Sequence, residues 1–596
     1  MTQAQITLRN HAASASATAT PSPAIRKNPL DITVLANIAR STSSVSPMSV
    51  MLATLDWAGH LAVSPGKRLE LARLAIEECL KLAGYLQASA LKGVAAEDAE
   101  PVAAPAQDRR FAAPAWHAWP FNLLHQSFLF ADAWWQQATI GVPGVSRHHE
   151  HVISFAARQL LDVFSPGNYL ATNPLVIEKT VASGGANLQQ GLMNAIEDFQ
   201  RTLRDQPPVG TESFVVGRDV AVTPGKVVFR NRLIELIQYA PTTAQVCPEP
   251  VLIVPAWIMK YYILDLSPAN SLVRYLVARG HTVFCISWKN PTAEDAKLGM
   301  DEYLALGFEA ALAAVNAIVP GVKVHATGYC LGGTLLTIAN AAMTRDGDER
   351  LASMTLFTAQ TDFTEPGELA LFIDESEVSM LEAQMRDTGY LTAGQMAGAF
   401  QMLRSYDLLW SRMVSEYLMG ERAPVNDLMA WNADTTRMPA RMHAQYLRRL
   451  FLNDDLSEGR YPVRCKPVVL TDIDTPIFCV ATMTDHVAPW RSVYKLHYLT
   501  PTEITFVLTN GGHNAGIVSE PGRPRRHFQI LERPAGANYV PPDDWQLIAP
   551  RQEGSWWPAW TAWLQARSGT PVAPPAMGAE GYPPIEDAPG RYVREK

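Results

Sequence analysis

Apolar residues follow a helical spacing in the first third of the chain. Between residues 65 and about 87 they recur at steps of three and four, which predicts an amphipathic helix. A linker rich in Gly, Ala, Pro and acidic residues follows at about 93–112, and then an aromatic segment at 116–135 with more helical pattern through about 205. We therefore expect a mostly helical N-terminal domain over residues 46–212.

The first 45 residues lack this pattern. They contain the Ser-, Ala- and Thr-rich run HAASASATATPSPA, a composition that offers little apolar surface to bury. We expect a disordered tail over residues 1–45. A transit peptide has a similar composition and is the alternative.

Beyond residue 213, short β-branched runs alternate with longer helical stretches. Several of these runs are apolar at nearly every position, which is typical of parallel strands covered on both faces by helices. The alternation predicts an α/β fold with a doubly wound, mostly parallel sheet over residues 213–596. The expected strands are 233–239, 251–254, 282–287, 322–327, 354–358, 477–481 and 504–508.

One long segment interrupts the alternation. Residues 374–465 are rich in Met, Leu, Tyr and Arg, have a helical pattern and lie between two expected strands. An insertion at this place would form a cap or lid over the carboxyl edge of the sheet, where such folds bind ligands.

Composition narrows the classes of function. The chain is 47% hydrophobic and 18% charged, with a formal net charge of -8, which does not favour nucleic acid as a partner. No apolar stretch reaches the roughly 18 residues that span a bilayer, and we expect no secretory signal and no transmembrane segment. The six cysteines are scattered without a CxxC pair, which argues against disulfides or zinc and fits a reducing, cytoplasmic compartment.

The sharpest local motif is Gly328-Tyr329-Cys330-Leu331-Gly332, which directly follows an expected strand and precedes a helical run. It has the form of a nucleophile elbow, with cysteine as the nucleophile and glycines that let the backbone close tightly. The N-terminus of the following helix favours a thiolate at Cys330. The backbone N–H of Leu331 would be one donor of an oxyanion hole.

A cysteine nucleophile needs a base, and the base needs an orienting acid. Asp485 lies on the loop after strand 477–481, and His513 lies on the Gly-Gly loop after strand 504–508. The order nucleophile, acid, histidine is that of the α/β-hydrolase fold. We therefore predict this fold, with Cys330, Asp485 and His513 as a catalytic triad.

Other assignments of these residues remain open. Asp485 could instead cap a helix that begins near Pro489, and the adjacent His486 is a rival base. Asp362, which follows strand 354–358, is a rival acid. The run His148-His149-Glu150-His151 resembles a metal cluster, but adjacent histidines point to different faces, so we expect a solvated turn and no metal site.

The chain resembles the bacterial polyhydroxyalkanoate synthases, especially the long single-subunit class I type. The resemblance extends from about residue 116 to the end and is weakest over the first 110 residues. The blocks that carry it are 260–266 (KYYILDL), 287–291 (SWKNP), 485–490 (DHVAPW), 512–513 (GH), 554–558 (GSWWP) and 589–593 (PGRYV).

This resemblance implies an acyltransferase that polymerises (R)-3-hydroxyacyl-CoA thioesters into a polyester with release of CoA. Cys330 would carry the acyl group, His513 would be its general base, and Asp485 would orient His513 or assist activation of the attacking hydroxyl. The implied partners are the growing polyester chain, the surface of a cytoplasmic polyester granule and a second copy of the chain. No metal or organic cofactor is expected, since the CoA thioester is the substrate.

The sequence departs from the family after strand 251–254. Relatives have a Pro-Pro-Cys-Ile-Asn-Lys type of segment, where this chain has Pro-Ala-Trp-Ile-Met-Lys. A backbone N–H of Trp257 or Ile258 in this loop would be the second oxyanion donor, and the bulk of Trp257 raises a question about pocket size. Asn514 is polar where an apolar residue is expected.

Two alternative functions remain. A thioesterase or esterase would use the same triad with water as the acceptor. A non-catalytic protein that binds a granule or membrane surface would instead use the tryptophan clusters at 116–135 and 556–563 as anchors.

Overall fold

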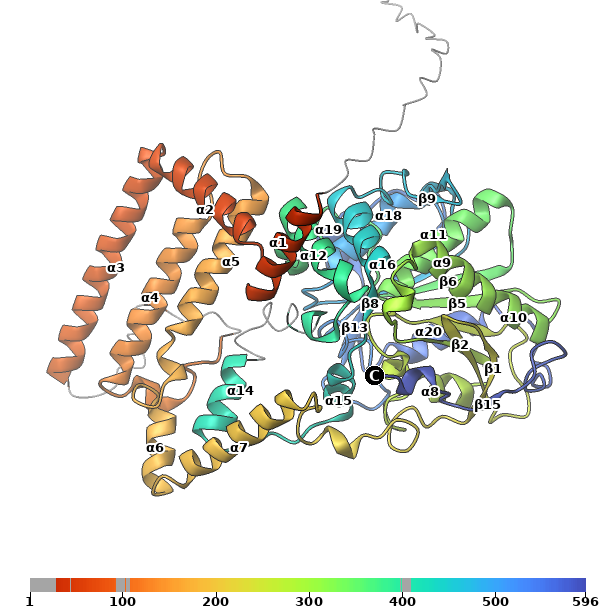
Figure 1. Ribbon diagram of the computed structural model, residues 1–596, viewed down its shortest axis with the longest axis horizontal. Helices are drawn as coiled ribbons and strands as arrows, with labels where there is room; N and C mark the ends of the chain where they lie inside the picture. Colours follow the sequence, from red (N-terminus) through yellow and green to blue (C-terminus); the bar gives the residue numbers. More distant parts are fainter. Residues whose placement is uncertain (1–27, 43, 93–101, 103–107, 397, 399–408) are drawn as a thin grey trace, which may run out of the picture.

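The computed structural model describes residues 28–42, 44–92, 102, 108–396, 398 and 409–596, with side chains omitted at 88–92. It consists of N-terminal helices, an α/β domain with one large sheet, and an insertion that lies between these two parts (Figure 1). None of the described helices is long and apolar enough to cross a membrane.

The sheet has 11 strands in the order β14-β13-β12-β11-β6-β5-β3-β4-β2-β1-β15. The six central strands, β12 to β4 in this order, are parallel, and the strands at both edges pair antiparallel. The α/β fold class is confirmed, and all seven expected strands are present. The strands are β1 Gly225–Arg230, β2 Ile234–Tyr239, β3 Val251–Val254, β4 Val283–Trp288, β5 Val324–Tyr329, β6 Leu351–Phe357, β11 Ile477–Thr482, β12 Ile504–Thr509, β13 His527–Arg533, β14 Arg551–Glu553 and β15 Glu586–Asp587.

The central strands divide their side chains between two hydrophobic cores. In β3, Leu252 and Val254 join one core, which includes α10 (Ala310–Ile318) and α11 (Leu331–Asp346). Val251 and Ile253 join the other, which includes α8 (Leu272–Ala278) and α20 (Trp557–Gln565). Because successive strand residues point to opposite faces, a strand covered on both sides is buried at every position, and in β3 all four residues are apolar.

The tryptophans near the C-terminus belong to the second core. Trp556, Trp557, Trp560 and Trp563 are all buried, so they are not available as surface anchors. The tryptophans of the aromatic segment 116–135 differ in exposure: Trp116 is fully buried, and Trp119 is 73% exposed.

The mostly helical N-terminal domain is confirmed. Its helices are α1 Pro29–Ser41, α2 Pro47–Ala62, α3 Pro65–Lys92, α4 Phe121–Thr139, α5 Arg147–Val163, α6 Pro174–Ala182 and α7 Ala186–Leu203. The expected linker at 93–112 lies mostly outside the described residues.

Helix α1 corrects the expectation of a disordered tail over residues 1–45. The side chain of Asn28 caps it by accepting a hydrogen bond from the Leu30 N–H, and Ala36 and Ala39 are buried where α1 packs on α12. Residues 1–27 lie outside the described part of the chain.

The insertion between β6 and β11 is largely helical, as the sequence predicts for 374–465. It contains α12 (Glu375–Thr388), α14 (Ser411–Met413), the π-helical turn η10 (Val414–Leu418), α15 (Asp427–Ala433), α16 (Ala440–Tyr446) and the π-helical turn η11 (Leu447–Leu452), with the short strand pair β7 (Tyr390–Leu391) and β8 (Met438–Pro439).

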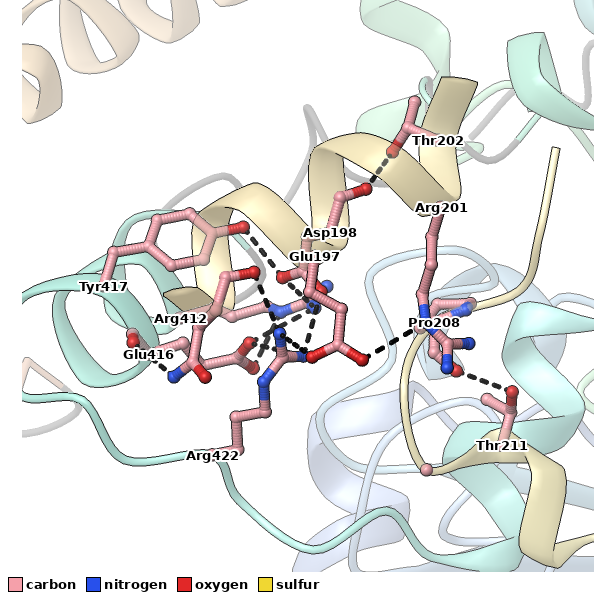
Figure 2. Close-up of polar contacts among 12 residues, drawn as sticks. Glu197, Asp198, Arg201, Thr202, Pro208, Thr211, Arg412, Glu416, Tyr417 and Arg422 are labelled. Carbon is pink, nitrogen blue, oxygen red and sulfur yellow. Dashed lines mark hydrogen bonds and ion pairs between the residues drawn. The ribbon is translucent and has the colours of Figure 1, made fainter. Parts of the chain in front are cut away.

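Helix α7 holds the insertion against the N-terminal domain through a charged cluster (Figure 2). Arg422 Nη1 lies 2.9 Å from Asp198 Oδ1, and Tyr417 donates a hydrogen bond to Asp198 over 3.0 Å. Arg412 pairs with Glu416 at 2.8 Å and also reaches Asp198. The approach is close, because a Cβ at Gly191 would overlap the backbone carbonyl of Tyr417.

Candidate active site

Cys330 lies in the turn between β5 and α11. Its φ of 52° and ψ of -123° are unusual for a residue with a side chain, and its N–H donates to the carbonyl of Phe357 over 2.9 Å. The glycines on either side have no room for a side chain, since a Cβ at Gly328 would overlap Gly333 and one at Gly332 would overlap the carbonyl of Val254. The predicted elbow geometry is therefore present.

The predicted acid and base lie together at the carboxyl edge of the sheet. His513 Nδ1 is 2.8 Å from Asp485 Oδ2, and Asp485 has a fully buried side chain. The same oxygen accepts a hydrogen bond from Thr482 over 3.0 Å. The N–H groups of Val487 and Ala488 donate to Oδ1 of Asp485 over 2.9 and 2.8 Å, so the carboxylate is held by its own loop.

Electrostatics favour a charged pair at this position. Burial disfavours the imidazolium of His513, but the charges of Asp485 and Cys330, with hydrogen bonds to both, raise the pKa of His513 well above its usual value. Burial acts against the carboxylate of Asp485 as well, but the charge and hydrogen bond of His513 and the two backbone N–H groups lower its pKa. His513 is thus hydrogen-bonded to Asp485 and lies close enough to Cys330 for the two groups to interact, so all three predicted residues lie together.

The rival assignments have other surroundings. Asp362 accepts hydrogen bonds from Lys495 at 3.1 Å and Tyr498 at 3.0 Å. Helix α17 (Trp490–Tyr494) begins after Pro489, and no side-chain bond caps it, so Asp485 is not its cap. The imidazole hydrogen-bonded to Asp485 is that of His513.

The run 148–151 forms the first turn of α5. His149 Nδ1 is 2.6 Å from Asp56, and Glu150 accepts a hydrogen bond from the N–H of Gly141. No group of three or more His, Cys, Asp or Glu side chains in the described ranges is arranged to hold a metal ion.

The two loops expected to form an oxyanion hole flank Cys330. Leu331 begins α11, and Trp257 and Ile258 follow β3. The ring of Trp257 packs in the core, 6.0 Å from that of Trp288 and 5.0 Å from that of Tyr303, so the bulk of Trp257 is directed away from the cavity wall. Ile258 lines the cavity in its place.

A cavity of about 870 Å³ opens beside Cys330. Its wall is mostly apolar and is built by segments far apart in the sequence: the elbow, the insertion, α1 and α5. The N-terminal helices were not predicted to contribute. The lining residues include Arg40, Ser44, Cys330, Glu377, His443 and Tyr446.

Asn514 has a place in the site that the sequence did not reveal. Tyr329 of the elbow donates a hydrogen bond to Asn514 Oδ1 over 2.5 Å, and its ring centroid lies 5.9 Å from that of His513. A polar residue is therefore suited to this position, because it ties the histidine loop to the elbow.

Comparison with known proteins shows which family the chain belongs to. The model of the poly-beta-hydroxybutyrate polymerase N-terminus matches residues 107–276, a second N-terminal model of that polymerase matches 26–67, and the alpha/beta hydrolase fold matches 249–520. The poly(3-hydroxyalkanoate) polymerase of Methylorubrum extorquens is 40% identical over 516 residues, covering 86% of this chain and 85% of the relative. The chain belongs to the poly(3-hydroxyalkanoate) polymerase family.

Other relatives agree with this assignment. The polymerase subunit PhaC of Rhizobium etli is 35% identical, and the match covers 93% of this chain and 87% of the relative. That of Cupriavidus necator is 37% identical, and the match covers 85% of this chain and 86% of the relative.

Among solved structures, a monoacylglycerol lipase of Paleococcus ferrophilus matches with a TM-score of 0.29 and 14% identity, and the match covers 46% of this chain and 95% of the lipase.

Membership in the polymerase family has two consequences. The chain is an enzyme, a polymerising acyltransferase, so the hypothesis of a non-catalytic surface protein is not retained. The N-terminal model that matches 26–67 includes α1 and α2, which agrees with a folded segment where a disordered tail was expected.

Proposed function

We propose that this enzyme joins (R)-3-hydroxyacyl units from CoA thioesters into a polyester through acyl intermediates on Cys330. The observation that carries the proposal is the position of Cys330, at the wall of a largely apolar cavity and next to a hydrogen-bonded His513–Asp485 pair. The names of the relatives support the polyester product, and the residues support the route.

In the first step the Cys330 thiolate attacks the thioester carbonyl. The negative charge moves to the carbonyl oxygen, where the N–H of Leu331 and an N–H of Trp257 or Ile258 would stabilise it. The intermediate then collapses: the bond to the CoA sulfur breaks, and His513 gives its proton to the departing CoA thiolate. One thioester replaces another at nearly equal free energy, so the acyl group remains activated.

In the second step a 3-hydroxyl group attacks the acyl–Cys330 thioester. His513 takes the hydroxyl proton, an ester bond forms, and the Cys330 thiolate is released. Asp485 orients His513 and stabilises its charged form. The proposed chemistry uses no cofactor and no metal.

The covered cavity supports transfer to a hydroxyl over transfer to water. Both the insertion and the N-terminal helices form its wall, and apolar walls around the nucleophile limit access of water to a reactive acyl intermediate. The proposal includes binding of the enzyme to the surface of a cytoplasmic polyester granule. Exposed apolar residues of the N-terminal domain, such as Leu192, Phe199 and Leu203, support this. The proposed homodimer rests on family resemblance.

The test is incubation of the purified protein with (R)-3-hydroxybutyryl-CoA, with CoA release and polymer measured together. Cys330→Ala should abolish both, and Cys330→Ser should retain little polymerisation, because its oxoester intermediate is less activated. Cys79→Ala changes an exposed cysteine and serves as the matched control with full activity expected.

Two outcomes would contradict the proposal. CoA release with soluble monomeric acid and no polymer would indicate a thioesterase. Polymerisation by Cys330→Ala at the wild-type rate would exclude Cys330 as the nucleophile.

A further inference from the structure

His443 of α16 is a buried polar residue with an unused ring nitrogen. Its side chain lines the cavity beside Cys330 and the residue is 6% exposed. Its Nδ1 is buried and has no hydrogen-bond partner within the described part of the chain. Burial lowers the pKa of His443 to about 4, so the imidazole is neutral at physiological pH and offers one donor and one acceptor.

Tyr446 lies three residues further along the same helix. Residues at this spacing share a helix face, and Tyr446 lines the same cavity as His443. Phe451 and Phe363 hold its ring edge-on, with centroids 5.2 and 6.4 Å away. Burial and the charge of Cys330 raise the pKa of Tyr446 well above its usual value. Its hydroxyl therefore stays protonated and can donate a hydrogen bond near Cys330.

Three other polar residues of the cavity wall already bind partners within the protein. Arg40 pairs with Asp387 at 2.6 Å, and Ser44 donates a hydrogen bond to Gln384 over 2.9 Å. Glu377 accepts a hydrogen bond from the N–H of Ser46 over 2.7 Å. Because a buried polar atom without a partner is costly, the imidazole of His443 retains hydrogen-bonding capacity that the described part of the protein does not use.

The substrate offers a matching group. A 3-hydroxyacyl thioester has only two polar positions, the thioester carbonyl and the oxygen on carbon 3. The carbonyl faces the proposed oxyanion donors, which leaves the 3-oxygen in an otherwise apolar wall. A neutral imidazole can accept a hydrogen bond from a hydroxyl, and a tyrosine hydroxyl can donate one to it.

We propose that His443 and Tyr446 bind the 3-oxygen of the acyl group carried on Cys330 and thereby select its configuration. This inference rests on the proposed function. The thioester carbon at Cys330, the 3-oxygen at the polar pair and the alkyl substituent against the apolar wall give three points of contact. Three points distinguish the two configurations at carbon 3, because the wrong one exchanges the oxygen with the alkyl group or hydrogen.

The experiment compares acylation rates with three thioesters: (R)-3-hydroxybutyryl-CoA, its (S) isomer and butyryl-CoA. Butyryl-CoA lacks the hydroxyl, so it reports acylation of Cys330 without binding at carbon 3. The rate of the first equivalent of CoA released is measured for the wild type, Tyr446→Phe, His443→Leu and His443→Asn. Tyr498→Phe is the matched control, since its hydroxyl binds Asp362 and does not line the cavity.

Tyr446→Phe should slow acylation by the (R) thioester about 10-fold, lower the (R)/(S) ratio by a similar factor and leave the butyryl rate unchanged. His443→Leu should behave alike, with partial recovery in His443→Asn, which restores a polar group. The Tyr446 variant removes one oxygen only and preserves ring packing, so it tests the pair even where His443→Leu does not fold.

An equal loss with all three thioesters would overturn the inference, because it would indicate a structural role. An unchanged (R) rate in Tyr446→Phe would overturn it too. Failure of the wild type to be acylated on Cys330 by any thioester would instead contradict the proposed function.

Discussion

Asp485 divides its two carboxylate oxygens between two tasks. Oδ1 accepts the N–H groups of Val487 and Ala488, and Oδ2 faces His513 and Thr482. The two backbone N–H groups fix the orientation of the carboxylate, and its other oxygen is thereby held toward His513. This division supports a role in orienting His513, since the oxygen nearest the base is already committed to it.

Replacement of Asp485 by Asn tests this role through pH dependence. The charge of Asp485 raises the pKa of His513, so loss of that charge should make the imidazolium lose its proton at lower pH. At neutral pH the thiolate of Cys330 would then lack its cationic partner. We expect Asp485→Asn to slow alkylation of Cys330 by iodoacetamide about 10-fold at pH 7, as for a loss of one pKa unit.

The alkylation experiment needs a background and a control. Cys79 and Cys465 are exposed and would be alkylated too, so the rate of Cys330→Ala is subtracted. Asp362→Asn removes a buried carboxylate that binds Lys495, and it should leave alkylation of Cys330 unchanged. An unaltered pH profile in Asp485→Asn would refute the role of Asp485 in charging His513.

At the scale of elements, the sequence predicts what depends on local pattern. The central strands are buried at nearly every position because both faces are covered, and the elbow is marked in the sequence by glycines next to Cys330. The antiparallel strand β13, which lies next to the edge strand β14, was missed because it is only partly buried and lacks that pattern. Helix α1 was missed because its buried residues are small alanines, while Leu30 and Val34 are exposed.

Gly191 marks a contact that no local pattern predicts. A Cβ at this position in α7 would overlap the backbone carbonyl of Tyr417, and a backbone cannot yield as a flexible side chain can. We expect Gly191→Ala to destabilise the protein by about 1–3 kcal/mol through separation of α7 from η10, despite the better helix propensity of alanine. Thermal unfolding monitored by circular dichroism measures the effect.

Gly59→Ala is the matched control for this change. Gly59 is also inside a helix, α2, but a Cβ there meets nothing within 4 Å. Alanine should therefore leave stability equal or raise it by up to about 1 kcal/mol. Equal effects of the two substitutions would show that the close contact of α7 with η10 does not matter.

At the scale of the whole molecule, the catalytic cavity is completed by parts that are distant in sequence. Helices α1 and α5 and the insertion supply walls to a site whose proposed nucleophile, acid and base come from the α/β domain. The proposed triad could be derived from the sequence because each member follows its own strand, whereas the cavity could not, because its walls meet only through long-range packing. The hydrogen bond from the Ser46 N–H to Glu377, which links the N-terminal domain to the insertion, lies where these walls meet.

The carboxyl group of Glu377 makes this contact between the N-terminal domain and the insertion sensitive to pH. Burial raises the pKa of Glu377 from 4.5 to about 7, with Asp374 adding to the effect and the hydrogen bond from Ser46 opposing it. In the folded protein the carboxyl keeps its proton to a higher pH than in the unfolded chain. Its contribution to stability is therefore fully present below about pH 4.5 and is lost as the pH rises through about 7.

Glu377→Gln should remove this dependence, because glutamine stays neutral and its oxygen can still accept the hydrogen bond of Ser46. Relative to the wild type, the variant should gain stability between pH 4.5 and 7, reaching at most about 3 kcal/mol above pH 7. The difference in thermal midpoint between the two proteins, measured from pH 4.5 to 8, checks it. At pH 4.5 the two should unfold together, which is the internal control, and a difference that stays constant across this range would show that Glu377 does not titrate at the join between the N-terminal domain and the insertion.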